Sequence, residues 1–430
     1  MLVPSLGLAP AGLARRFAPG ETVLRSGGTR YPFARDGFFT NSKRWLVAGV
    51  IAVQLHGCGL ETYVSDFMAG EENTTPPAPL TEFEPTTEIE ELWSVDIGAG
   101  TDEHYLKLAP AVAGETVFIA DRNGEVYAVD INSGDTLWER DTGAPVSGGP
   151  GIAEDMVLLG TQDGEVLALS RSDGALLWTA SVSSEVLSPP AGEEGIVVAR
   201  TVDGKLFGID AANGKRLWTY DRQVPVLTLR GTSAPIVVAG LTLAGFDSGA
   251  LVALEIATGK VAWETQIAQP RGRSDLERMV DVDADLLVFR DTLYVASYRG
   301  RVAAVSIESG RVEWDQEHSS YAGMGVDADN LYLADDESIV WALDRFSGSS
   351  AWRQKKLRGR AATAPVSSGD YIVVGDLEGY LHWMRRDNGK LAARVQVDDA
   401  AIIVPPLIVN ATVIAYSSSG TLSAYRAGSE

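Results

Sequence analysis

Residues 115–143 read ETVFIADRNGEVYAVDINSGDTLWERDTG, and the same pattern recurs along most of the chain. The unit holds an apolar strand, a polar turn that ends in glycine, an alternating strand, a second glycine turn, and a strand that carries tryptophan. Short strands that repeat about every 40 residues are typical of β-propeller blades. The repeat therefore indicates the fold class.

The tryptophan of this unit keeps its register in six repeats, and an alanine takes its place in the seventh. These positions are Trp138, Trp178, Trp218, Trp263, Trp314, Trp352 and Ala393. Gly420 marks an eighth hairpin turn with no tryptophan strand after it, and residues 91–95 supply a matching strand at the other end of the repeat region. The sequence predicts an all-β, eight-bladed β-propeller over residues 91–427, with four antiparallel strands per blade and the last blade closed by the N-terminal strand.

The regular glycines and tryptophans have structural explanations. A glycine lies four residues before each position of the tryptophan series, where a tight hairpin turn requires a positive φ. A ring that recurs once per blade is expected to be buried between adjacent blades rather than to bind a cofactor.

Composition excludes several classes of protein. The chain has 430 residues, of which 45% are hydrophobic, so it can bury a large core. Asp and Glu outnumber Lys and Arg by 58 to 36, and a net charge of −22 argues against a nucleic-acid partner. A single cysteine excludes a disulfide framework and a Cys-x-x-Cys redox pair.

An apolar run without charges, WLVAGVIAVQL at 45–55, follows Lys43 and Arg44 and precedes Cys58. It is too short to cross a bilayer as a helix but suits the apolar region of a signal peptide. The run resembles a bacterial lipobox, which implies a lipoprotein signal peptide at 43–57 and a diacylglycerol on the thiol of Cys58. The alternative is a buried apolar helix with an incidental cysteine.

The segments on either side of this signal differ in character. Residues 1–42 are an extension of uncertain status, explained either by a mis-assigned start codon or by an unusually long leading region. Residues 58–90 are rich in Pro and Glu, a composition that cannot build a core and predicts an extended, solvated tether.

The repeat is similar to the blade motif of PQQ-dependent quinoprotein dehydrogenases. The pattern A-x-D-x-x-x-G-x-x-x-W occurs at 128–138 and at 342–352. After the predicted signal peptide, the remaining histidines are His104, His318 and His382, which lie far apart without the spacing of metal ligands. We therefore expect no catalytic residue, no bound cofactor and no metal site.

Two connections break the period of the repeat. Extra residues follow Trp218 and Trp263, in the segments 222–231 and 269–283. Both segments join the outer strand of one blade to the inner strand of the next, so they should lie side by side on one face. The predicted protein-binding patch consists of Leu227, Leu229, Arg230, Asp281 and Asp283. The alternative is that both loops only pack on the propeller, with Arg230 paired internally.

The same segments carry a family resemblance. VPVLTLRGTSAP at 224–235, SDLERMVDVD at 274–283 and VVGDLEGYLHW at 373–383 resemble the BamB family of outer-membrane assembly lipoproteins. The resemblance implies a non-enzymatic scaffold in the β-barrel assembly (Bam) complex, lipid-anchored in the outer membrane and facing the periplasm.

The resemblance also implies partners. The family's propeller binds a POTRA domain of BamA, and its contact positions fall on the five residues of the predicted patch. Other Bam subunits and unfolded outer-membrane protein clients are further partners that the resemblance implies. We expect the propeller itself to be monomeric.

Two other functions remain open from the sequence. A PQQ- or metal-dependent periplasmic dehydrogenase would use the same repeat, and so would a PQQ-like propeller that binds a different periplasmic partner.

Overall fold

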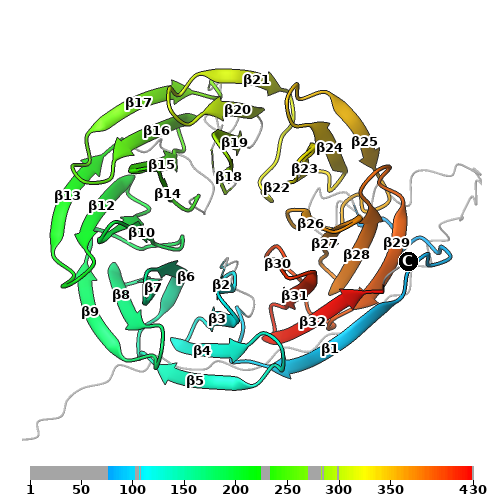
Figure 1. Cartoon of the computed structure of the whole chain (residues 1–430), viewed down its shortest axis with the longest axis horizontal. Helices are drawn as coiled ribbons and strands as arrows, with labels where there is room; N and C mark the ends of the chain where they lie inside the picture. Colours follow the sequence, from blue (N-terminus) through cyan, green and yellow to red (C-terminus); the bar gives the residue numbers. More distant parts are fainter. Residues whose placement is uncertain are drawn as a thin grey trace, which may run out of the picture. The chain divides into compact units, whose positions relative to one another are not determined.

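The computed structural model describes residues 76–101, 106, 108–223, 233–269, 282, 285–297 and 300–428. Within them, eight four-stranded antiparallel sheets follow one another around a ring (Figure 1). Each sheet is one blade, whose first strand lies on the inner side of the ring and whose fourth lies at the rim. This confirms the prediction of an eight-bladed propeller.

Blades 1 to 4 consist of β2 (Ala111–Ala113), β3 (Thr116–Ala120), β4 (Glu125–Asp130) and β5 (Thr136–Asp141); β6 (Val146–Ala153), β7 (Met156–Thr161), β8 (Glu165–Ser170) and β9 (Leu176–Ser181); β10 (Ala191–Glu193), β11 (Ile196–Arg200), β12 (Lys205–Asp210) and β13 (Arg216–Asp221); and β14 (Ile236–Val238), β15 (Leu241–Gly245), β16 (Ala250–Glu255) and β17 (Val261–Gln266).

Blades 5 to 8 consist of β18 (Leu287–Phe289), β19 (Thr292–Ala296), β20 (Val302–Ser306) and β21 (Val312–Gln316); β22 (Met324–Val326), β23 (Asn330–Ala334), β24 (Val340–Asp344) and β25 (Ser350–Gln354); β26 (Val366–Ser368), β27 (Tyr371–Gly375), β28 (Tyr380–Arg385) and β29 (Leu391–Gln396); and β30 (Leu407–Val409), β31 (Thr412–Tyr416), β32 (Thr421–Ala427) and β1 (Ile89–Asp96).

The core lies between the blades rather than at the centre of the ring. Both faces of each sheet meet a neighbouring sheet, so the middle strands are apolar on both sides, as in β3, where four consecutive residues are buried. Eight clusters of buried side chains result, each shared by two adjacent blades. One of them joins Leu158 of blade 2 to Val197 and Phe207 of blade 3.

The tryptophans link each blade to the next. Trp138 packs on the Gly174 turn of blade 2, and its Nε1 donates a hydrogen bond to the carbonyl of Arg171 at 3.0 Å. The same indole-to-carbonyl bond to the next blade is made by Trp93, Trp178, Trp218, Trp263, Trp314 and Trp352. The prediction that these rings are interblade packing residues is confirmed.

The ring closes as the sequence predicts. β1 pairs with β32 in antiparallel register, with Trp93 opposite Ala424. A second contact ties blade 7 to blade 8, since the carboxylate of Asp398 accepts hydrogen bonds from Ser417, Ser419 and Thr421. Burial alone would raise the pKa of Asp398, but these hydrogen bonds lower it to about 2.

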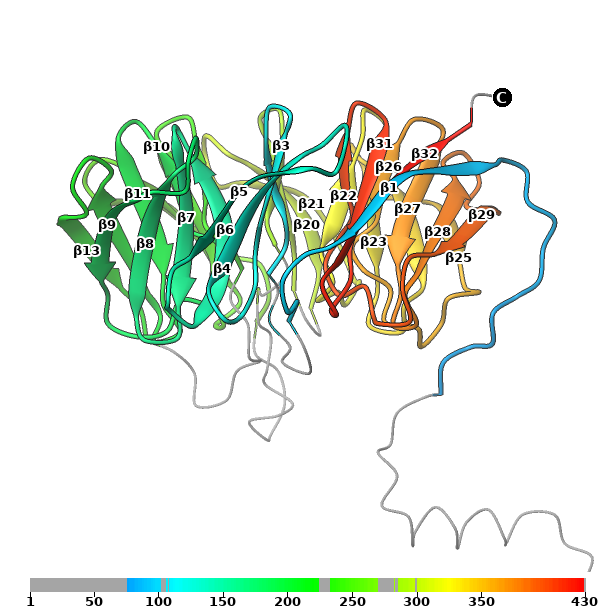
Figure 2. The same ribbon diagram turned by 90° about the horizontal axis from the view of Figure 1, so that it is seen from below.

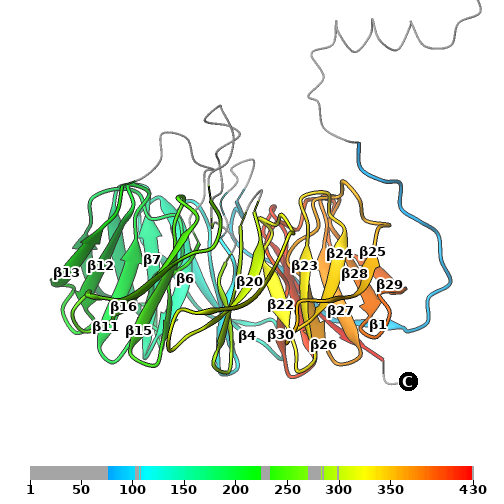
Figure 3. The same cartoon turned by 90° about the horizontal axis from the view of Figure 1, so that it is seen from above.

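All connections from an outer strand to the inner strand of the next blade emerge on one face of the ring, because strand direction alternates within a blade. We call it the linker face. The turn between the second and third strands of each blade lies on the same face, and the turn between the third and fourth strands lies on the opposite one. Figures 2 and 3 show the ring edge-on.

The segment before β1 differs from the expectation of a solvated tether. Residues 76–88 run along the outside of blade 7, from the start of β1 to the linker face (Figure 2). The amide of Thr86 donates to the carbonyl of Ala392 at 2.9 Å, and the amide of Ala78 donates to the carbonyl of Arg358 at 2.9 Å. Composition indicated solvation, but these contacts use backbone groups, which composition does not reveal.

Candidate functional site

The two long connections between blades are the candidate site. The side chains predicted to form the patch, Leu227, Leu229, Arg230, Asp281 and Asp283, lie outside the residues that the structure describes, and so does Cys58. The structure does describe the ends of both connections.

The first connection begins at Arg222 and ends at Ser233. Arg222 contacts residues of blade 4, and Ser233 contacts Arg200 of β11 in blade 3. The guanidinium of Arg222 donates to Glu264 at 2.9 Å and to Ser248 at 3.3 Å, and it lies 5.4 Å from the ring centre of Phe246. The hydroxyl of Ser233 accepts a hydrogen bond from Arg200 at 2.9 Å. Arg222 and Ser233, the described ends of the first connection, are therefore held by residues of blades 3 and 4.

The second connection meets the first. Val282 is fully buried against Gly245, where an added Cβ would come within 2.4 Å of the valine side chain. The carboxylate of Asp285 accepts a hydrogen bond from the amide of Ala234 at 3.2 Å. The described ends of the two connections at Ala234 and Asp285 are thus neighbours.

We call the place where the two described ends meet, at Ala234 and Asp285, the junction. A buried ion pair supports it. Arg200 is 1% exposed and Asp247 is 9% exposed, and their side chains pair at 2.9 Å. Burial raises the pKa of Asp247, and the charge of Arg200 opposes that rise. Removing either partner would leave a buried charge unpaired, which costs about 3–5 kcal/mol in other proteins.

Phe246 is a site residue that sequence reasoning missed. It lies three residues before the glycine of the turn between β15 and β16, and the other blades place a polar residue there: Asp121, Thr161, Thr201, Ser297, Asp335, Asp376 and Ser417. In blade 1 that residue caps the turn, since the carboxylate of Asp121 accepts from the amides of Asn123 and Glu125 at 2.9 Å. Blade 4 replaces this cap with an apolar ring.

The ring of Phe246 is 3% exposed and holds both cations of the junction. Arg200 lies 5.1 Å from the ring centre and Arg222 lies 5.4 Å from it. Guanidinium groups are attracted to aromatic faces at such distances. The sequence contains a signal for this departure: Phe246 is the one apolar residue at a repeat position that is polar in the seven other blades.

The described histidines have structural partners. His382 is fully buried, and its Nε2 lies 2.7 Å from a carboxylate oxygen of Asp376, the turn cap of blade 7. His318 packs on Trp341 with ring centres 4.8 Å apart. In the part of the chain that the structure describes, no three His, Cys, Asp or Glu side chains are grouped so that they could hold a metal ion.

No helix in the described ranges combines the length and the apolar character needed to span a bilayer.

The chain is similar to proteins of one family. A family model described as outer membrane protein assembly factor BamB matches residues 82–171 and 122–354. The outer membrane protein assembly factor BamB of Alkalilimnicola ehrlichii is 55% identical over 337 residues, which are 78% of this chain and 88% of the relative. That of Pseudomonas aeruginosa is 47% identical over 382 residues, which are 89% of this chain and 99% of the relative.

Solved structures show the same fold. The crystal structure of BamB from Moraxella catarrhalis has a TM-score of 0.73 and 26% identity, and the match covers 79% of this chain and all of that one. The quinohemoprotein alcohol dehydrogenase of Comamonas testosteroni has a TM-score of 0.63 at 13% identity, over 78% of this chain and 76% of the enzyme. The likeness to the dehydrogenase is one of fold alone, whereas the family model and the curated relatives agree on one family. The chain belongs to the BamB family of outer membrane protein assembly factors.

Proposed function

We propose that this chain, a non-enzymatic component of the outer-membrane β-barrel assembly machinery, acts there as a scaffold and binds the POTRA region of BamA through its two long connections. The observation that carries the proposal is the junction at blade 4. There the ends of both connections meet, and the repeat replaces a polar turn cap with Phe246.

The contacts at the junction favour a binding surface that is fixed before the partner arrives. A binding surface needs anchors whose positions are fixed before the partner arrives, because ordering them on binding costs affinity. The hydrogen bond between Ala234 and Asp285 and the buried pair of Arg200 and Asp247 hold the ends of both connections. Leu227 and Leu229 would then supply desolvated contacts, and Arg230, Asp281 and Asp283 would set orientation.

The proposed location is the periplasmic side of the outer membrane. Cys58 would carry the lipid, and the preceding signal at 43–57 would be removed. The propeller would act as a monomer next to BamA and the other subunits of the Bam complex.

Direct capture of unfolded client proteins receives less support. Strand addition requires a regular exposed edge, and every outer strand of this propeller carries a β-bulge immediately before its tryptophan register. Bulges disturb an edge and discourage pairing with another strand. We therefore assign the scaffold role to the linker face rather than to the rim.

Co-purification with BamA tests the proposal. The double variant Leu229→Ala/Arg230→Ala should lose BamA while its circular dichroism spectrum stays that of the wild type. A matched control is Arg216→Ala/Leu217→Ala, which removes the same two residue types from exposed positions of β13, outside both connections. Undiminished binding by the first variant, or equal loss by the control, would refute the assigned patch.

The two alternative functions predict other outcomes. A dehydrogenase would reduce a dye in the presence of PQQ, Ca²⁺ and an alcohol or sugar, and such turnover would overturn the scaffold proposal. If the propeller binds a different partner, even the wild-type protein should fail to co-purify with BamA.

A further inference from the structure

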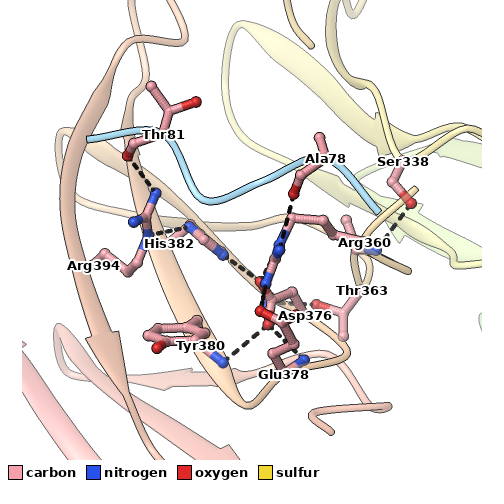
Figure 4. A network of polar contacts seen from close by, with 12 residues as sticks. Ala78, Thr81, Ser338, Arg360, Thr363, Asp376, Glu378, Tyr380, His382 and Arg394 are labelled. Atoms are coloured by element: carbon pink, nitrogen blue, oxygen red, sulfur yellow. Dashed lines mark hydrogen bonds and ion pairs between the residues drawn. The ribbon is translucent and has the colours of Figure 1, made fainter. Parts of the chain in front are cut away.

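The segment 76–88 is held on blade 7 by a network of charged side chains, shown in Figure 4. Arg360 donates to the carbonyl of Ala78 at 3.0 Å, and Arg394 donates to the carbonyl of Thr81 at 3.1 Å. The guanidinium of Arg394 also lies 5.2 Å from the ring centre of Phe83. We call this segment the strap and the network of Arg360, Asp376, His382 and Arg394 the clasp.

The clasp is fixed from within blade 7. Arg360 is 2% exposed and pairs with the fully buried Asp376 at 2.8 Å. Asp376 also lies 2.7 Å from Nε2 of His382, and Nδ1 of the same ring accepts a hydrogen bond from Nε of Arg394 at 3.2 Å. Both arginines are therefore oriented by one carboxylate, Arg360 directly and Arg394 through the imidazole.

This arrangement requires a neutral His382. With Nδ1 accepting from Arg394, the ring proton sits on Nε2 and is donated to Asp376. Burial lowers the pKa of His382, while the hydrogen bond and charge of Asp376 oppose that effect. Buried polar groups of this kind stabilise one geometry when each member has its partner.

The strap crosses the full height of the ring. Its C-terminal end joins β1, which begins beside the end of β32 on the face opposite the linker face, with Ile89 opposite Ala427. Its N-terminal end lies on the linker face, where Ala78 is bonded to Arg358 in the connection between β25 and β26. Without the clasp, the chain would leave the ring from the opposite face.

We propose that the clasp determines which face of the propeller is turned toward the membrane. The inference rests on the proposed lipidation of Cys58. Since the strap leaves the ring on the linker face, that face, with both long connections, lies nearest the lipid surface. At ~3.3 Å per residue, residues 58–78 reach at most about 65 Å, whereas a chain free up to Ile89 would reach about 100 Å.

The proposal gives the clasp a role beyond stability. A scaffold on a free tether would present its faces to the membrane at random. When the tether is held at the linker face, the scaffold presents the two connections toward the membrane that contains the barrel subunit. Arg360, Arg394 and Phe83 are thus positioning residues for the lipid surface.

Energy transfer to labelled lipids tests the orientation. Cys58 would be acylated, so an engineered cysteine is the only free thiol in the full-length lipoprotein. A donor is attached at Gln162→Cys, in the β7–β8 turn on the linker face, or at Ser172→Cys, in the β8–β9 turn on the opposite face. Both positions are exposed and belong to blade 2. The protein is reconstituted in vesicles that contain a rhodamine-labelled phospholipid.

In the otherwise wild-type protein, transfer should be greater from position 162 than from position 172. In the Phe83→Ala/Arg360→Ala/Arg394→Ala variant, which removes both guanidinium groups that hold the strap, this difference should be lost. Phe83→Ala alone, which changes only the strap, should reduce the difference even if loss of Arg394 disturbs blade 7. Glu82→Ala, an exposed strap position, is the matched control and should keep the full difference.

Equal transfer from both positions in the wild type, or a difference that survives Phe83→Ala/Arg360→Ala/Arg394→Ala, would overturn the proposal. Flotation of the protein with the vesicles separates this failure from a failure of lipidation. A protein that does not float, or a Cys58→Ala variant that floats as well as the wild type, would contradict the anchor itself.

Discussion

Trp383 on β28 lies directly opposite Ala393 on β29, which reverses the order found in every other blade. Elsewhere the large ring is on the outer strand and its partner on the neighbouring strand is Ala or Gly, as for Trp138 opposite Ala128 and Trp218 opposite Gly208. The total side-chain volume of the pair is kept, but the ring changes strand.

The closure of the ring explains the reversal. An outer tryptophan docks on the turn between the third and fourth strands of the next blade, and blade 8 has no such turn, because β32 and β1 come from opposite ends of the propeller. The ring of Trp383 packs edge-on against Tyr425 of blade 8, with ring centres 6.3 Å apart. The missing tryptophan at the seventh register thus marks the seam.

Trp383→Ala should lower the free energy of unfolding by about 3–5 kcal/mol, because a fully buried ring is removed from between blades 7 and 8. The swapped variant Trp383→Ala/Ala393→Trp should not recover this loss, since the ring at position 393 has no turn to dock on. Chemical denaturation followed by circular dichroism measures both. Full recovery by the swapped variant would contradict the explanation of the seam.

The turn glycines make a second prediction with an internal control. Gly174 and Gly143 have φ of +68° and +66°, but a Cβ at Gly174 would lie 2.8 Å from Trp138, whereas nothing lies within 4 Å of one at Gly143. Gly143→Ala should cost about 1 kcal/mol for the strained backbone alone. Gly174→Ala should cost about 1–3 kcal/mol more, because the ring must move.

Denaturation midpoints of the two variants give this comparison directly. If Gly143→Ala and Gly174→Ala lose the same stability, the glycines are needed only for the turn and not for the tryptophan.

The clasp predicts a pH dependence of stability. Burial lowers the pKa of His382 below its ordinary value of 6.5, so the unfolded chain binds a proton on this residue before the folded one does. Its contribution to stability is present above pH 6.5 and is lost as the pH falls from there through the folded pKa. Asp376 does not titrate in this range, because its partners His382 and Arg360 hold its pKa below 3.8 despite its burial.

Comparison with His382→Gln isolates this effect. The variant should be less stable than the wild type at pH 7.5, and the gap should narrow on acidification to pH 5, by up to about 1.4 kcal/mol per pH unit. His318 also has a pKa lowered by burial, but it is present in both proteins and cancels. A gap that does not change with pH would show that His382 is protonated equally in both states.

The arrangement of the blades was predictable from the sequence, because each repeat forms one blade and the repeats can be counted. The spacing of Gly134 and Trp138, kept through the chain, gives the number of blades, and Trp93 outside the series gives the closure. The outer tryptophan makes the same local contact in every blade except blade 7, so one repeat contains most of the information for all.

The candidate site was harder to predict from the sequence, because it depends on residues that depart from the repeat. Phe246 stands alone among polar caps, and its two cations, Arg200 and Arg222, come from the preceding blade. The strap was assigned to solvent because its Pro and Glu content gave no sign of binding. Arg360 and Arg394 hold its carbonyl groups, which every residue has, so side-chain composition could not reveal the contact.

Hydrogen–deuterium exchange of the full-length protein, with and without the POTRA region of BamA, tests the central claim most directly. The account predicts that BamA slows exchange in peptides covering 224–232 and 270–284 and leaves the rim strands of blades 1 to 3 unchanged. Unchanged exchange in both connections, with protection at the rim or on the opposite face, would contradict it.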